Sequence, residues 1–358
     1  MKNIKGKIIN HNNSFNGEIS FKERINHIKK ISNKDFDNYI IPGFVDLHCH
    51  GGGGHDTMAG LFDIINMSKY HLTKGTTTIL PTTLTASLND TLKAVKGLNK
   101  YIQTHQTSVI GIHLEGPFIN SNKLGAQPPF TQLPNIKFVN KIQKEAIVKV
   151  ITLAPELKGS ENFIKLLLKK NIQVQIGHSL ADYNCCKKIM HNKKIGFTHL
   201  YNAMSGNHHR DPGVLTAALR DAEYAEIICD LFHVNKENIH IAHKCIPKLY
   251  SVSDSISATG MPDGRYDFAK LKIIKKNNQA LIKKNVLAGS VVNMYDTFKN
   301  LIKINFSLNQ AVAMTSYNAS KYLNEKFIGK IEKNYYSNFL VLDKKLNLKK
   351  VYFNGKLI

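Results

Sequence analysis

Short apolar stretches alternate with helical segments from Ile41 to Leu323, and this alternation is the feature that most constrains the fold. Helical segments such as 161–170 and 238–244 separate the stretches, which lie at 77–80, 109–114, 148–153, 172–176, 195–199, 225–229, 249–253 and 286–289. About eight strands, each followed by a helix, fit a (β/α)8 TIM-like barrel better than an open sheet. We therefore predict an α/β fold in which residues 41–324 form a barrel domain.

The two ends of the chain have a different texture from the middle. Residues 1–40 alternate short apolar runs with Asn and Gly turns, for example at 12–13 and 16–17. The segments 338–343 and 349–356 repeat that pattern near the C-terminus. Runs of this kind predict small hairpins. We expect residues 1–40 and 325–358 to form one small β-sandwich domain, into which the barrel is inserted.

The chain is strongly basic, with 49 Lys and Arg residues against 26 Asp and Glu residues and a formal net charge of +23. Such a balance is typical of proteins that bind nucleic acids or membranes. Here the lysines are scattered through the sequence, and arginine occurs only at positions 24, 210, 220 and 265. Because nucleic-acid surfaces usually cluster charge and use arginine, we expect no nucleic-acid partner. A basic surface would still attract an anionic substrate.

The cysteines and the N-terminus predict a cytoplasmic location. The five cysteines, at positions 49, 185, 186, 229 and 245, show no CxxC pair or disulfide framework, which favours reduced thiols. Residues 1–5 lack the apolar core of a signal peptide, and no apolar stretch is long enough to cross a bilayer. We therefore expect no membrane partner.

Candidate metal ligands follow several of the predicted strands. His48 and His50 close the first apolar stretch, and residues at i and i+2 of a strand face the same side. Other imidazole and carboxylate side chains end later strands, namely Glu115, His178, His199 and Asp254. The carboxyl ends of barrel strands meet at one rim, where chemistry is found in this fold. These residue types at one rim predict a catalytic divalent ion such as zinc or iron.

Further residues suggest how such a site would work. A metal with an open position makes bound water acidic, and Asp254 is suited to collect the proton and deliver it to a leaving group. His233, after the strand at 225–229, could polarise a carbonyl group, or it could be an ordinary rim histidine. Arg210 could bind a phosphate through its guanidinium group, or it could pair with Asp211.

Eight motifs, in order along nearly the whole chain, resemble the N-acetylglucosamine-6-phosphate deacetylases, a family of the amidohydrolase superfamily. They are Pro-Gly-Phe-Val-Asp-Leu-His-x-His (42–50), His-Leu-Glu-Gly-Pro-Phe (113–118), Gly-Ala-Gln (125–127), Gly-His-Ser (177–179), Thr-His-Leu-Tyr-Asn-Ala-Met (198–204), His-His-Arg-Asp-Pro-Gly (208–213), Ser-Asp-Ser (253–255) and Leu-Ala-Gly-Ser (287–290). The second and fifth motifs are the most specific; His-x-His and Gly-His-Ser are more widely shared.

The resemblance implies a role for each matched residue. Glu115, His178 and His199 would be the principal metal ligands, and His48 and His50 would hold a second ion, with Glu115 between the two ions. Asp254 would be the acid/base and His233 the carbonyl polariser. The residues implied to meet the substrate are Ala126, Gln127, Asn202, Ala203, Arg210, Asp230, Leu231, Phe232, His233, Leu287, Ala288 and Gly289. Arg210 would reach the sugar phosphate across the interface of a homodimer.

The activity implied is hydrolytic deacetylation of N-acetyl-D-glucosamine 6-phosphate, in amino-sugar catabolism and cell-wall sugar recycling. One alternative is another N-acetylated amino-sugar phosphate, such as N-acetylgalactosamine 6-phosphate. A second alternative, a basic nucleic-acid-binding protein without catalysis, predicts missing ligands, and none is missing. The sequence leaves open whether the ion is zinc, iron, cobalt or manganese, and whether one or two ions are bound per subunit.

The chain departs from the family pattern at three positions. Leu231 stands where the family commonly has Gly after the aspartate, which could narrow the pocket. Asn334 replaces the second glycine of a Gly-x-Ile-x-x-Gly segment, and Asn338 stands where Asp is usual. The last two positions fall in the predicted β domain, so we expect them to affect stability rather than chemistry.

Overall fold

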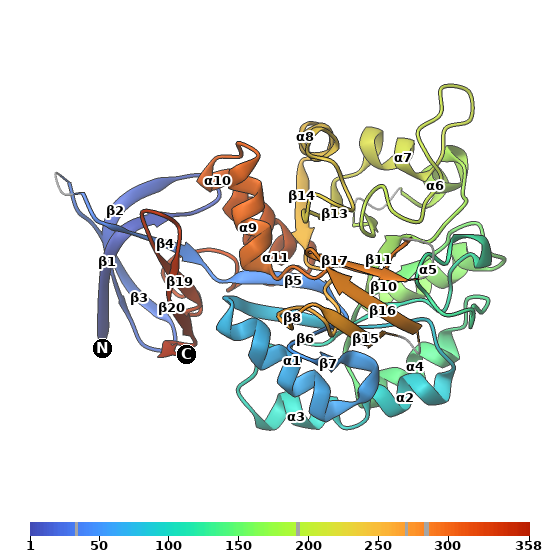
Figure 1. Ribbon diagram of the computed structural model, residues 1–358, viewed down its shortest axis with the longest axis horizontal. Coiled ribbons are helices and arrows are strands. Elements are labelled where there is room, and N and C mark those ends of the chain that lie inside the picture. Colours follow the sequence, from blue (N-terminus) through green and yellow to red (C-terminus); the bar gives the residue numbers. More distant parts are fainter. Residues whose placement is uncertain (33–34, 191–193, 269–270, 283–285) are drawn as a thin grey trace.

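The computed structural model describes residues 1–32, 35–190, 194–268, 271–282 and 286–358. Figure 1 shows a sheet that contains both ends of the chain on one side and a larger part with helices and parallel strands on the other. Among the described residues, no helix has the length and apolar character needed to span a bilayer. The cysteines are all free thiols.

One mixed sheet of seven strands joins the two ends of the chain, in the order β21-β20-β19-β4-β1-β2-β3. Its strands are β1 (Lys2–Ile9), β2 (Ser14–Phe21), β3 (Ile25–Lys30), β4 (Asn38–Pro42), β19 (Phe339–Asp343), β20 (Leu348–Phe353) and β21 (Lys356–Leu357). We expected a β-sandwich of two sheets. A single sheet forms because β4 bonds on both sides, parallel to β1 and antiparallel to β19. The sheet packs around a core that includes Ile8, Phe21, Ile40 and Phe339.

The larger part contains two parallel sheets. One has the order β12-β11-β10-β9-β8-β5, and the other pairs β13 with β14. Their strands are β5 (Phe44–Cys49), β8 (Thr76–Thr83), β9 (Ile112–Glu115), β10 (Val148–Leu153), β11 (Gln173–Ile176), β12 (Gly196–Phe197), β13 (Tyr224–Ile228) and β14 (Lys248–Val252). Backbone hydrogen bonds link the segments just beyond β12 and β14 to the neighbouring sheet, for example from Leu200 N–H to Glu226 O (2.8 Å) and from Asp254 N–H to His48 O (2.9 Å). The parallel α/β architecture is therefore confirmed, and the closed (β/α)8 barrel stays a prediction.

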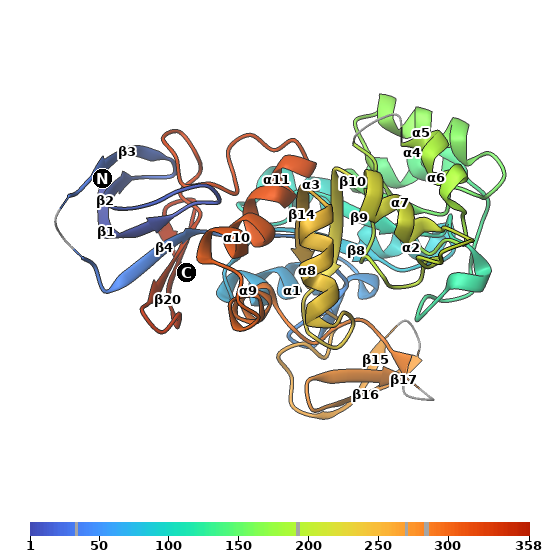
Figure 2. The ribbon, with the colours of Figure 1, turned by 90° about the horizontal axis from the view of Figure 1, so that it is seen from above.

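Helices alternate with these strands and cover their outer side (Figures 1 and 2). They are α1 (Leu61–Thr73), α2 (Leu88–Val95), α3 (Leu98–Thr104), α4 (Ile136–Glu145), α5 (Ser160–Lys169), α6 (Tyr183–Ile189), α7 (Val214–Asp221), α8 (Lys236–Cys245), α9 (Met294–Lys303), α10 (Leu308–Val312) and α11 (Asn318–Tyr322). α4 illustrates why they form: Asn135 caps its first turn, accepting the N–H of Lys137 at 3.0 Å. Its apolar residues then recur on one face and bury Phe138 and Ile142 in the main core.

The expectation of a barrel strand at 286–289 is wrong. Residues Val286–Leu287 form β18, which pairs antiparallel with β17 in a four-stranded sheet of order β15-β16-β17-β18. The other strands are β15 (Gly264–Phe268), β16 (Leu271–Lys276) and β17 (Gln279–Ile282). Figure 2 shows this sheet projecting from the body of the molecule. A short apolar run has the same appearance in a barrel strand and in an inserted hairpin, so its local pattern could not distinguish them. A further short hairpin pairs β6 (Gly51–Gly52) with β7 (His55–Asp56).

Candidate active site

Three predicted ligands meet just beyond the ends of neighbouring parallel strands. Glu115 ends β9, whereas His178 and His199 each lie two residues beyond β11 and β12. Glu115 Oε1 lies 3.0 Å from both His178 Nε2 and His199 Nε2, and the two nitrogens lie 3.1 Å apart. All three side chains are buried. We call Glu115, His178 and His199 the strand-end triad.

The hydrogen bonds of His178 show that the strand-end triad fits a metal ion. Its Nδ1 lies 2.7 Å from the carbonyl oxygen of Lys123, so Nδ1 carries a proton and donates it. In the neutral ring, Nε2 is then a bare lone pair, and it faces the Glu115 carboxylate at 3.0 Å. Two acceptors at that distance repel each other unless a proton or a cation lies between them. A histidine held in this way by its other nitrogen is the usual arrangement for a metal ligand.

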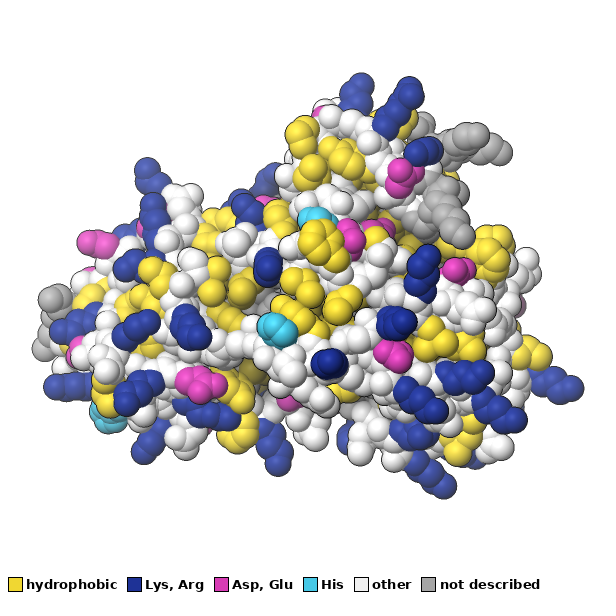
Figure 3. All heavy atoms as spheres, turned by 90° about the horizontal axis from the view of Figure 1, so that it is seen from below, with side chains coloured by type: hydrophobic (Ala, Val, Ile, Leu, Met, Phe, Trp, Pro, Cys, Tyr) yellow, Lys and Arg dark blue, Asp and Glu magenta, His cyan; other side chains and the backbone are white. Residues whose placement is uncertain are grey.

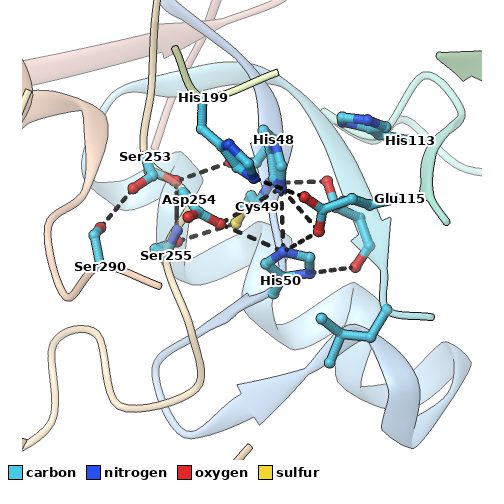
Figure 4. A network of polar contacts seen from close by, with 12 residues as sticks. His48, Cys49, His50, His113, Glu115, His199, Ser253, Asp254, Ser255 and Ser290 are labelled. Atoms are coloured by element: carbon cyan, nitrogen blue, oxygen red, sulfur yellow. Dashed lines mark hydrogen bonds and ion pairs between the residues drawn. The ribbon is translucent and has the colours of Figure 1, made fainter. Parts of the chain in front are cut away.

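His48 and His50, which we call the buried pair, meet beside Glu115 and His199 of the strand-end triad (Figure 4). Their Nε2 atoms lie 3.1 Å apart, as their i, i+2 spacing predicted. His50 Nδ1 donates to the carbonyl oxygen of Thr82 at 3.0 Å, and His48 Nδ1 donates to Glu226 Oε1 at 2.6 Å. Both Nε2 atoms therefore point at carboxylate oxygens. Asp254 Oδ1 lies 3.3 Å from His50 Nε2 and 3.4 Å from His48 Nε2.

Glu115 belongs to both groups of ligands. Its second oxygen, Oε2, lies 3.1 Å from His50 Nε2 and 3.5 Å from His48 Nε2, while Oε1 serves the strand-end triad. Gln127 orients that second oxygen: its Oε1 accepts the N–H of Thr85 at 2.7 Å, which turns its Nε2 toward Glu115 Oε2. A carboxylate shared in this way could bridge two ions.

The charges of the site favour a cation. Burial opposes protonation of the buried pair, yet Glu115, Glu226 and Asp254 together hold the pKa of His48 well above its ordinary value. The pKa of His50 is raised to about 9, against the effect of burial, by Asp254 and Glu115. Burial would raise the pKa of Asp254, but His48 and His50 lower it to about 2. A field that retains protons on buried imidazoles also suits a divalent ion.

Several site residues have a strained backbone. His178, His199 and Asp254 have φ values of 49°, 25° and 46°, in the left-handed region that costs a non-glycine residue about 1–3 kcal/mol. Local hydrogen bonds hold this geometry: Asp254 N–H donates to His48 O at 2.9 Å, and His199 N–H donates to Glu226 Oε1 at 3.1 Å. The strain turns the side chains toward a common point beyond the strands.

His233 and Asp254 face the same pocket. His233 Nδ1 donates to Asp230 Oδ2 at 2.7 Å, and Asp230 Oδ1 accepts the N–H groups of Phe232 and His233, both at 2.9 Å. The Nε2 of His233 is thus free to face a ligand. Burial lowers the pKa of His233, but Asp230 and then Asp254 raise it above the ordinary value. The ring is therefore suited to donate a proton or a hydrogen bond.

A cavity of about 250 Å³ opens above these groups. It is lined by His50, Leu84, Glu115, Gly125, Ala126, Gln127, His178, His199, Asn202, Ala203, Ile228, His233, Asp254, Phe268, Val286, Leu287 and Gly289. Its walls thus combine the ligand cluster with an apolar side that includes Leu84 and Phe268. Ala126, Gln127, Asn202, Ala203, Leu287 and Gly289 were all expected at the substrate, and the structure brings them to the cavity.

Five other residues expected to meet the substrate lie outside the cavity lining. Asp230 supports His233, Ala288 is fully buried, and Arg210 is exposed on the surface. Phe232 is 45% exposed. Leu231, with φ of 68°, packs against the main apolar core, so it does not narrow the pocket as its size suggested. A backbone bend after Asp230 turns the Leu231 side chain away from the site.

Glu226 was missed in the sequence, although it is fully buried and binds His48. Its signal was a carboxylate inside the apolar strand 225–228, where burial of a charge requires a partner. Asp46 was also missed: its carboxylate accepts the Ser253 hydroxyl at 2.6 Å and the Ser253 N–H at 3.1 Å, joining β5 to the segment of Asp254.

Residues 39–358 match the model of the amidohydrolase family. The chain belongs to the amidohydrolase family. Amidohydrolases similar to it over most of their length include the N-acetylglucosamine-6-phosphate deacetylases of Vibrio furnissii (32% identical, covering 89% of this chain and 82% of the relative) and Bacillus subtilis strain 168 (34%, covering 80% and 76%). An N-acetylgalactosamine-6-phosphate deacetylase of Escherichia coli O157:H7 is 28% identical (89% and 87%).

Solved amidohydrolase structures have the same fold. The N-acetylglucosamine-6-phosphate deacetylase of Thermotoga maritima superposes with a TM-score of 0.92 at 29% identity, covering 99% of both chains. A mutant of the Mycobacterium smegmatis enzyme, in complex with N-acetyl-D-glucosamine-6-phosphate, superposes with a TM-score of 0.92 at 25% identity, covering 99% of this chain and 98% of that chain. Members of this family are metal-dependent hydrolases, in agreement with the ligand groups described above.

Proposed function

We infer that this protein hydrolyses N-acetyl-D-glucosamine 6-phosphate to D-glucosamine 6-phosphate and acetate. The observation that carries this inference is the meeting of the strand-end triad, Asp254 and His233 around one cavity. The similarity to deacetylases of this sugar phosphate, over most of the chain, supports the choice of substrate. The apolar wall at Leu84 and Phe268 suits the methyl group of an acetyl substituent.

The side chains have complementary tasks in this reaction. A divalent ion held by the ligands would supply the electrophile that makes water acidic enough to attack an amide at neutral pH. Asp254 takes a proton from the attacking water, whose oxygen bonds to the carbonyl carbon. His233 Nε2 donates a hydrogen bond to the carbonyl oxygen as negative charge develops there. When the C–N bond breaks, Asp254 returns the proton to the amine nitrogen; the second proton of the water stays on the new carboxyl group and is released to solvent as acetate leaves with the free amino sugar.

We propose zinc or iron as the ion, with the strand-end triad as its principal site. A set of imidazole and carboxylate donors suits these metals, although cobalt and manganese are also accepted by such sites. The buried pair, together with Asp254 and Glu115 Oε2, would hold a second ion. The number of metal ions per subunit, one or two, therefore depends on whether the buried pair holds an ion.

The phosphate group requires a cation that the cavity lacks. Among the described residues that line it, none is Lys or Arg. Arg210 is exposed at the surface, and His208 rather than Arg210 pairs with Asp211, at 3.1 Å. We propose that Arg210 binds the phosphate in the site of a second subunit of a homodimer. Arg210→Ala should then raise KM about tenfold with kcat changed less than twofold, since a lost charged hydrogen bond costs about 1.5 kcal/mol or more. An unchanged KM would refute the assignment.

Basic side chains elsewhere support capture of an anionic substrate rather than a polymer. Figure 3 shows Lys and Arg side chains spread over the face in view, interrupted by acidic and apolar groups. A spread positive field raises the local concentration of a small anion. The alternative, a nucleic-acid-binding protein without catalysis, would be favoured if the protein bound nucleic acid with a steep dependence on salt and released no acetate.

The second candidate substrate is N-acetyl-D-galactosamine 6-phosphate, because the relative from Escherichia coli O157:H7 is named for that epimer. The two sugars differ in the orientation of one hydroxyl group. Comparison of kcat/KM for the two sugar phosphates separates the candidates, and we expect the glucosamine derivative to be preferred.

Acetate release from N-acetyl-D-glucosamine 6-phosphate, measured with the metal-loaded protein and after chelation, tests the main proposal. We expect turnover that chelation abolishes and that added zinc or iron restores. Folded, metal-loaded protein that releases no acetate from either sugar phosphate would overturn it.

We also propose that the two parallel sheets together form a closed (β/α)8 barrel of residues 41–324, with a β domain of residues 1–40 and 325–358. The hydrogen bonds that link the segment after β12 to β13, and the segment after β14 to β5, support this division. The free cysteines support a cytoplasmic location.

A further inference from the structure

Glu226 is a buried carboxylate that touches both groups of metal ligands. It lies on β13 in an otherwise apolar sequence, and it is 0% exposed. Its Oε1 accepts two hydrogen bonds, from His48 Nδ1 at 2.6 Å and from the backbone N–H of His199 at 3.1 Å. His48 belongs to the buried pair and His199 to the strand-end triad. One oxygen atom therefore holds a member of each group.

We propose that Glu226 is a positioning residue that sets the affinity of the buried pair for a metal ion. It acts through His48, because the hydrogen bond at Nδ1 fixes the ring and aims Nε2 at the ligand cluster, where a metal ion would take the place of the Nε2 proton. Its second hydrogen bond, from the backbone N–H of His199, holds the same oxygen in place beside a residue with a strained φ of 25°.

The orientation of the Glu226 carboxylate is itself held. Its Oε2 accepts from Gln175 Nε2 at 3.0 Å, and the same Nε2 also donates to Tyr250 Oη at 2.6 Å. The other atom of the Gln175 amide, Oε1, accepts from the Thr198 hydroxyl at 3.0 Å. Since Gln175, Thr198 and Tyr250 are fully buried, the carboxylate has a single orientation.

Among the described residues, no Lys or Arg pairs with the negative charge of Glu226. Within the described part of the chain, Glu226 forms an ion pair with His48, and its other hydrogen-bond donors are neutral. A charge buried without Lys or Arg is costly unless positive charge lies nearby. A cation at the buried pair would supply that charge, and Glu226 in turn would strengthen its binding.

Metal binding by Glu226→Gln tests the proposal directly. The substitution keeps the size of the side chain and an oxygen that can accept from His48, but it removes the charge. We expect the wild-type chain to bind two Co²⁺ ions in a calorimetric titration of the metal-free protein. In Glu226→Gln, the Kd of the weaker ion should rise at least about tenfold, the effect typical of a lost carboxylate partner of a ligating histidine. The Kd of the tighter ion should change less than threefold.

Glu223→Gln is the matched control. Glu223 lies three positions earlier and pairs at the surface with Lys248 at 2.6 Å, so its substitution should leave both Kd values unchanged. Thermal unfolding of the metal-free proteins separates this role from a general loss of stability, and Glu226→Asp replaces Glu226→Gln if the latter does not fold.

Three results would overturn the proposal: a wild-type chain that binds one ion, a Glu226 variant that binds both ions with unchanged Kd, or an equal weakening of both ions. The proposal rests on the metal centre of the proposed function, but the titration does not depend on turnover. A chain that binds two ions as expected and releases no acetate would refute the deacetylase activity and leave the role of Glu226 intact.

Discussion

The strand-end triad and the buried pair are built from the same residue types but have different access to the pocket. All three members of the triad line the cavity, whereas His48 is 0% exposed and lies behind it. The Nδ1 atoms of the buried pair are both held by acceptors, while His199 Nδ1 has no hydrogen-bond partner among the described residues. His50 also lines the cavity, so the comparison teaches that the buried pair reaches the pocket through His50 alone, whereas all three members of the triad can meet a ligand there.

Glu115 belongs to both groups, because its Oε1 faces the strand-end triad and its Oε2 faces the buried pair. Glu115→Gln should weaken metal binding at both positions and lower acetate release by about 10³-fold or more, because the several kcal/mol that a metal ion contributes to the transition state are lost. The metal content of the purified variant and its rate of acetate release test these two expectations. Glu325→Gln, which alters a surface ion pair with Lys149, is the control and should retain full activity. A variant that keeps both ions would show that Glu115 is not shared.

Asp254→Asn should separate chemistry from metal binding at the strand-end triad. We expect kcat to fall about 10³-fold, because the amide cannot take the proton of water and return it to the amine. Metal bound at the triad should remain, since Asp254 Oδ1 faces the buried pair. Steady-state kinetics and metal analysis provide the test. Activity within tenfold of the wild type would remove Asp254 from the acid/base role.

Replacement of both His48 and His50 with Ala should sharpen the contrast between the two groups. The metal content should fall by one ion per chain, and acetate release should decrease by about tenfold, as in proteins that lose a supporting group of a metal site. Elemental analysis of the purified protein gives the count. His105→Ala, at an exposed histidine, should change neither quantity. If the double variant keeps both ions, the buried pair has a structural role and binds no metal.

Leu231→Gly should have the smallest effect, because Leu231 belongs to neither group. Glycine relieves a backbone strain at φ of 68° of about 1 kcal/mol, but it loses the apolar packing of the side chain. We expect the free energy of unfolding to change by about 1 kcal/mol or less and KM by less than twofold. Chemical denaturation and substrate titration measure both. A tenfold change in KM would restore the hypothesis that Leu231 shapes the pocket.

The sequence by itself determined the parallel α/β architecture and most of the ligand cluster. Hydrophobic periodicity reports local burial, so it located β8, β10, β11, β13 and β14, and polar residues just beyond such strands had to gather at one edge. It placed the candidate ligands at that edge for the same reason, whereas their division into two groups was implied by the family resemblance. It could not separate β18 from a barrel strand, because that distinction depends on which strand lies alongside.

Only the tertiary structure decided how the ligands are supported. His48 and Glu226 lie 178 positions apart, and no local pattern relates them. The left-handed backbone at His199 and Asp254, and the bend that turns Leu231 into the core, likewise arise from contacts between distant segments. Periodicity records whether a residue is buried, whereas the partner it meets in the interior depends on how the strands are arranged around it.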